Sequence, residues 1–298
     1  MSSTSSLSQP KNFGLKSLFE IACVVLLILS GFVHASLFLV DNHLWESPFS
    51  FRKAALFGVS TGLTLWSCLW AMEQLSPRRF DSWIRRGLCV LLVLEVFLIS
   101  MQTWRGQRSH FNDVGVFNRG IEVLMLLLIT AAMALIVFIT ILAWFSNLPT
   151  SRSSGSVCAI RWGLLFLCIS GGLGYVTTVL GYYLITMGLL PETWPARGVL
   201  KFPHGAALHA IQTLAIVAWI GDRWGGSGSI RAVQFAVFAH WFWLFFAAYQ
   251  SFTGRSRFEV DGIGLLLISA IVILCTAALW SLISITLLQV ATDKDATS

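Results

Sequence analysis

Residues 120–145 read GIEVLMLLLITAAMALIVFITILAWF and hold one charged side chain, that of Glu122. A helix rises about 1.5 Å per residue and the hydrocarbon core of a bilayer is about 30 Å thick, so this stretch can cross a membrane. Other apolar stretches of spanning length lie near residues 18–40, 53–73, 87–104, 159–189, 203–220, 231–250 and 262–290. The sequence therefore predicts an all-α fold, an integral membrane bundle of about eight transmembrane helices.

Composition and charge agree with a chain that uses lipid as its solvent. Of 298 residues, 56% are apolar and 11% are charged, and the mean hydropathy is +0.76. The net charge of +6 is spread in ones and twos between the apolar stretches, which argues against nucleic-acid binding. We expect a disordered cytoplasmic N-terminus over 1–17, one transmembrane domain over 18–290 and a disordered C-terminal tail over 291–298.

The polar connections set the expected orientation. If the N-terminus lies inside, 11 of the 20 Lys and Arg residues fall on the cytoplasmic side, which is a weak bias. The connections at 76–79, 151–155 and 221–226 are plain solvated turns, whereas those on the other side hold the unusual polar residues. We therefore expect a multi-pass protein of the cell inner membrane with both termini in the cytoplasm and a nearly apolar cytoplasmic half.

The third helix ends in the most distinctive segment, QTWRGQRSHFN at 102–112. One interpretation is a membrane-surface cap, in which Trp104 anchors the interface and the arginines meet lipid phosphates. The other is the mouth of a pocket that binds a polar or anionic headgroup. Its candidate ligand-binding residues are Gln102, Arg105, His110 and Asn112.

The sixth helix opens with PHGAALHAIQ at 203–212. In a regular helix His204 and His209 point about 140° apart, so they cannot readily share one metal ion. His209 and Gln212 share a face. His204 could accept a proton or ligate a metal, or it could simply touch water at the interface. We take His204 and Gln212 as candidate ligand-binding residues.

The seventh helix carries HWFWLFF at 240–246 and then Gln250, a further candidate ligand-binding residue. A histidine among so many rings suits a flat apolar ligand such as a haem, a quinone or a carotenoid. The alternative is an aromatic helix that faces lipid.

Glu95 is the only acid well inside a spanning stretch. A carboxylate there is costly, so it should face the protein interior with a partner or stay protonated. Counted along the helices from the membrane edge, Glu95 and His240 lie at similar depths, and so do His34 and His209. The candidate metal ligands are His34, Glu95, His209 and His240.

A short motif recurs at the ends of the third and seventh helices. Gln102 and Gly106 are followed by Phe111, and Gln250 and Gly254 are followed by Phe258. This spacing is compatible with a four-plus-four tandem repeat, in which an even number of helices per copy keeps both copies in one orientation.

The segments QxxRGxxSHFN and PHxxxLHxxQ resemble those of a family of bacterial polytopic membrane proteins of about this length. The similarity covers most of the helical core. The resemblance implies a bacterial membrane protein. It implies no activity and no site residues.

The leading hypothesis is a ligand-binding or redox site in the outer half of the bundle, for a haem, a metal, a quinone or a lipid headgroup. Haem b or a metal ion is the cofactor to test. A proton-coupled transporter and a structural subunit of a larger membrane complex are the alternatives. Expected partners are the lipid bilayer, a small apolar or lipid-like ligand and membrane-complex subunits. The short loops argue against hydrolysis of a soluble substrate, and whether the chain is an enzyme stays open.

Overall fold

The computed structural model describes residues 15–40, 47, 50–112, 114–146, 149, 153–189, 200–223 and 228–295, with backbone alone for 228 and 285–295. Helices are the only regular elements in this part of the chain. They are α1 (Leu18–Val40), α2 (Arg52–Gln74), α3 (Asp81–Trp104), α4 (Val116–Phe145), α5 (Ser154–Thr186), α6 (Lys201–Leu208), α7 (Ala210–Arg223), α8 (Gly228–Phe252) and α9 (Gly262–Asp295).

The predicted membrane bundle of about eight helices is confirmed. Within the described residues, seven helical units are long and apolar enough to span a membrane, and α6 and α7 together form one of them. With 24 residues, α3 has a similar length and packs against α1, α2 and α4. The helix of α9 continues to Asp295, past the predicted start of the tail at 291. Most of the predicted N-terminal tail, up to residue 14, lies outside the described residues.

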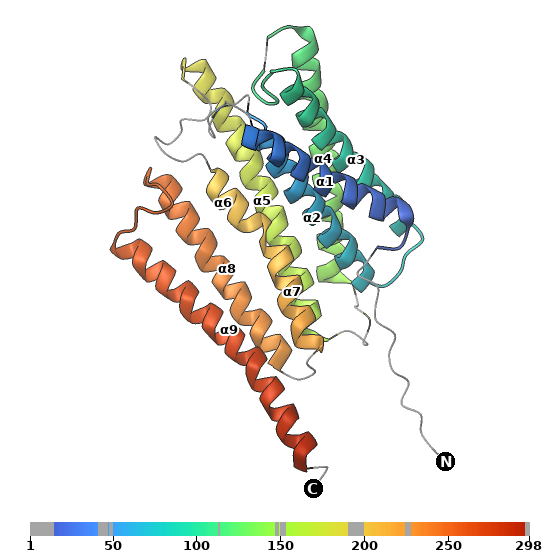
Figure 1. Cartoon of the computed structure of the whole chain (residues 1–298), viewed down its shortest axis with the longest axis vertical. Helices are drawn as coiled ribbons and strands as arrows, with labels where there is room; N and C mark the ends of the chain where they lie inside the picture. Colours follow the sequence, from blue (N-terminus) through green and yellow to red (C-terminus); the bar gives the residue numbers. More distant parts are fainter. Residues whose placement is uncertain are drawn as a thin grey trace.

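Two groups of helices lie side by side, α1 to α4 and α5 to α9, and both pack in the same order (Figure 1). In the first group α1 contacts α2 and α3, α2 contacts α3, and α3 contacts α4. In the second, α5 contacts α6, α7 and α8, both α6 and α7 contact α8, and α8 contacts α9. This order supports the predicted four-plus-four repeat, with α6 and α7 together corresponding to α2. The two groups meet where α4 contacts α5 and α2 contacts α7.

The ends of α3 and α8 are built alike. Gly106 and Gly254 have left-handed backbones, with φ of +64° and +68°. In both places the N–H five residues after the glutamine donates to the carbonyl of the glutamine at 2.9 Å. Gln102 and Gln250 are both fully buried. The repeated motif is therefore a glycine helix ending, which only a residue without a Cβ adopts at little cost.

Glycines also bring the first two helices of each half together. A Cβ on Gly31 would lie 2.5 Å from the backbone nitrogen of Val59, and one on Gly58 would lie 2.6 Å from the Cα of Gly31. In the second half, a Cβ on Gly163 would lie 3.0 Å from the Cα of Ile211. Val59 and Ile211 each follow an Ala-Ala-Leu sequence at the same spacing. Small residues allow this close approach, on which helix association in lipid depends.

Candidate functional site

The connection between α3 and α4 is held by its own polar side chains. Gln102 donates to Oδ1 of Asn118 at 3.3 Å, and Arg105 donates to the same oxygen at 3.0 Å and to Oε1 of Gln102. The guanidinium of Arg105 also lies 4.6 Å from the ring centroid of Phe117. The structure thus brings the predicted residues Gln102 and Arg105 together, with the first turn of α4 as their partner.

The loop 109–112 is fixed between α4 and α5. The carboxylate of Glu122 accepts the N–H groups of Phe111 at 2.5 Å and Asn112 at 3.1 Å, and Tyr182 donates to it at 2.5 Å. The φ of Phe111 is +58°, and a Cβ on Gly181 would lie 2.4 Å from the ring of Phe111. A left-handed phenylalanine is strained, so these contacts must hold it in place. They also fix the direction of the histidine that precedes it.

His110 reaches from this loop to α2. Nζ of Lys53 lies 3.2 Å from Nδ1 of His110, and the ring of Phe57 lies 6.3 Å from the imidazole. Because an ammonium group only donates, Nδ1 of His110 is the acceptor. The charge of Lys53 also acts on Glu95 of α3, which is 4% exposed. We call Lys53, Glu95 and His110 the lysine–glutamate site.

The protonation of His110 gives a test of this arrangement. Burial and then the charge of Lys53 hold the pKa of His110 well below its ordinary value. The unfolded chain therefore binds a proton that the folded protein does not, so stability is full above about pH 6.5 and falls as the pH drops below it.

Below about pH 6.5 we expect the free energy of unfolding of the wild type to fall by up to about 1.4 kcal/mol per pH unit more than that of a His110→Asn variant. Thermal unfolding in detergent at about pH 8 and about pH 5 measures this difference. Parallel pH profiles for the two proteins would contradict the burial of a neutral His110.

Three histidines lie on elements that pack against one another: His204 on α6, His209 at the break between α6 and α7, and His240 on α8. Nδ1 of His204 lies 2.8 Å from the carbonyl oxygen of Ser170, to which it donates. Nδ1 of His240 is buried with no partner in the described chain, and its ring lies 5.9 Å from that of Phe166. We call His204, His209 and His240 the histidine centre.

A helix break positions His209, which lies between the end of α6 and the start of α7. The side-chain amide nitrogen of Gln212 donates to the backbone carbonyls of Leu208 at 3.1 Å and His209 at 3.0 Å. In this orientation its amide oxygen faces the hydroxyl of Thr64 of α2 at 3.3 Å. Gln212 thus contacts the backbone carbonyl of His209, one turn before it on the same face. Broken helices persist in membranes where such partners satisfy the freed backbone groups.

The four predicted metal ligands do not form one set. Nε2 of His34 accepts from Trp104 at 3.0 Å, and its Nδ1 donates to the carbonyl of Ser30 at 2.7 Å. Glu95 belongs to the lysine–glutamate site, whereas His209 and His240 belong to the histidine centre. In the described ranges no group of three or more His, Cys, Asp or Glu side chains is placed to hold a metal ion. Equal depth along the helices therefore did not identify contact partners, because depth says nothing of lateral distance.

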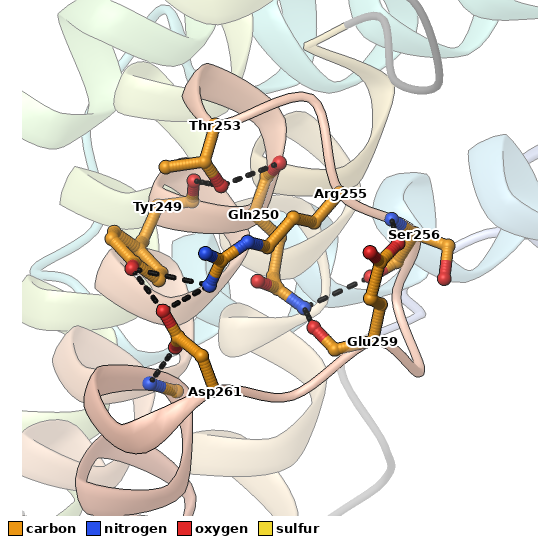
Figure 2. Close-up of polar contacts among 8 residues, drawn as sticks. Tyr249, Gln250, Thr253, Arg255, Ser256, Glu259 and Asp261 are labelled. Carbon is orange, nitrogen blue, oxygen red and sulfur yellow. Dashed lines mark hydrogen bonds and ion pairs between the residues drawn. The ribbon is translucent and has the colours of Figure 1, made fainter.

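Gln250 hydrogen-bonds the backbone of the connection between α8 and α9 (Figure 2). Its amide donates to the carbonyls of Ser256 at 2.9 Å and Glu259 at 2.8 Å. Asp261 accepts from Tyr249 at 2.6 Å and from the N–H of Gly264 at 2.8 Å, and it pairs with Arg255. These contacts hold the pKa of Asp261 well below its usual range, with the Tyr249 hydrogen bond contributing most. The predicted ligand-binding role of Gln250 gains no support here.

The predicted apolar cytoplasmic half was wrong, because an ion pair is buried where α1 and α3 begin. Arg85 donates to both carboxylate oxygens of Glu20 at 2.7 Å and to the carbonyl of Leu69 of α2 at 3.0 Å. In the second half, Asp222 of α7 accepts from Ser156 of α5 at 2.7 Å and from Ser229 of α8 at 3.1 Å. Each half thus has a polar contact that joins its first three spans. In the sequence, Glu20 lies near the start of the apolar stretch 18–40, and Arg85 lies just before the stretch 87–104.

Comparisons with protein-family models, with curated proteins and with solved structures give no match for this chain. The resemblance carried by the two motifs therefore stays a prediction.

Proposed function

We propose that this membrane protein binds a flat cofactor of the haem b type at the histidine centre, where His209 and His240 would hold it. The observation that carries the proposal is the unused imidazole of His240. Neither of its ring nitrogens makes a hydrogen bond in the described chain, and Nδ1 is buried. A buried polar atom without a partner is uncommon and favours a missing ligand.

The surroundings suit a planar tetrapyrrole better than a bare metal ion. A protein zinc site needs three or four donors, which the described residues do not assemble, whereas a haem needs only one or two axial side chains. Phe166 packs against Trp241 with their centroids 4.8 Å apart, beside His240. Gln212 holds the helix break at His209 through the carbonyls of Leu208 and His209. A bound haem would supply one-electron transfer.

Absorption spectroscopy of the purified protein tests the proposal. We expect a Soret band in protein expressed with haem supplementation, and a shifted band when haem is added to the apoprotein. His240→Ala and His209→Ala should each weaken haem binding by about tenfold or more, since each removes a residue that would hold the haem.

His34→Ala is the matched control, because His34 is buried but bonded to Trp104 and Ser30. It should keep the wild-type spectrum. A wild-type protein that stays colourless and gives no spectral shift with added haem would overturn the proposal.

We also propose a bacterial inner membrane with both termini in the cytoplasm. An even number of passes supports one side for Leu18 and Asp295, and the short α2–α3 connection with its arginines supports the cytoplasm for that side.

A further inference from the structure

A second group of polar side chains lies in the first half of the chain, with Glu95 buried and Lys53 and His110 partly buried. Lys53 comes from α2, Glu95 from α3 and His110 from the connection that follows α3. Lys53 also lies 5.7 Å from the ring centroid of Phe57, so an aromatic face borders these polar groups. The proposed haem site uses none of these residues.

Glu95 is the group whose bonding is incomplete. It is 4% exposed, and its Oε2 is buried without a hydrogen-bond partner in the described part of the chain. The charge of Lys53 reaches it, and Nζ of Lys53 also donates to His110. A carboxylate in a membrane span needs donors for its oxygens, because none come from lipid.

The loop 109–112 is built to keep this site in place. It keeps His110 against Lys53 through contacts from two further helices, Glu122 of α4 and Gly181 of α5. A strained loop that is held this firmly is typical of a binding site rather than of a plain connection. The missing element is a hydrogen-bond donor for Glu95 that can lie beside an aromatic ring.

We propose that the lysine–glutamate site binds the hydroxyl-bearing ring of a quinol or a similar phenol. A ring hydroxyl donates to Oε2 of Glu95, and the ring packs beside Phe57. The long apolar chain of such a ligand stays in the bilayer. This inference concerns binding alone and is independent of the haem proposal.

Equilibrium binding of decylubiquinol to the purified wild-type protein tests the inference, with its di-O-methyl ether as the matched ligand. The ether keeps the ring and the chain but has no O–H group. We expect the quinol to bind about tenfold or more tightly than the ether, because only the quinol can donate a hydrogen bond to the unpartnered Oε2 of Glu95. Equal affinities, or no binding of the quinol, would overturn the proposal and leave a buried water as the partner of Glu95.

Two variants locate the contact. Glu95→Met should abolish the preference for the quinol over the ether, because it removes the acceptor. Glu259→Gln, in the α8–α9 connection, should leave the preference unchanged. A preference that persists in a folded Glu95→Met protein would place the quinol elsewhere. Since the two ligands are compared on the wild type, the test stands even if a variant does not fold.

Discussion

Replacing Arg85 with methionine is expected to lower the free energy of unfolding by about 3–5 kcal/mol. The side chains of Arg85 and Glu20 are only 4% and 6% exposed, and two hydrogen bonds of 2.7 Å join them. The substitution leaves the carboxylate of Glu20 buried without its cation. Unfolding in mixed micelles with increasing SDS measures the loss.

Two further variants separate the ion pair from other effects. Glu20→Leu combined with Arg85→Met should recover most of the stability, because a buried ion pair replaced as a whole by apolar groups costs little. Arg86→Met, at the exposed neighbouring position, should change stability by less than about 0.5 kcal/mol. If Arg85→Met and Arg86→Met behave alike, the buried pair does not stabilise the first half.

Gly58→Leu is expected to have an effect of similar size, because it forces α1 and α2 apart. Even a Cβ at this position would lie 2.6 Å from the backbone of Gly31, and backbone atoms cannot move aside as a side chain can. Overpacking costs about 1–3 kcal/mol in adaptable cores, so we expect a loss at or above the upper end of that range. The thermal unfolding midpoint in detergent should fall accordingly.

The control for this substitution is Gly120→Leu in α4. A Cβ at Gly120 meets nothing within 4 Å, so the side chain enters open space at the membrane surface. Its unfolding midpoint should stay equal or rise slightly, since leucine favours a helix more than glycine does. An equal loss at both positions would mean that the α1–α2 contact is not close.

The spans of this fold could be predicted from the sequence because each is an apolar stretch of sufficient length. The window at 87–104 ends with α3 at Trp104, but the helix begins earlier, at Asp81. Arg85 falls outside the window because a charged side chain ends an apolar stretch. Arg85 is inside the bundle because Glu20, on a different helix, neutralises it, and no pattern along one helix reveals that partner.

The histidine centre could be predicted only in part. The angle of about 140° between His204 and His209 assumes a regular helix. The chain breaks at His209, so that assumption fails. The motif at 102–112 was a good indicator of unusual structure, yet most of its polar groups hold the loop. Lys53 was missed altogether, since its partners Glu95 and His110 are distant in the sequence.

The repeated packing of the two halves makes the chain resemble a dimer whose subunits are joined covalently. Each half contains its own glycine contact, its own helix ending and its own polar junction. The side chains that this shared frame holds differ between the halves. The first half carries Lys53 and Glu95 where the second carries three histidines, so the two proposed sites can be altered one at a time.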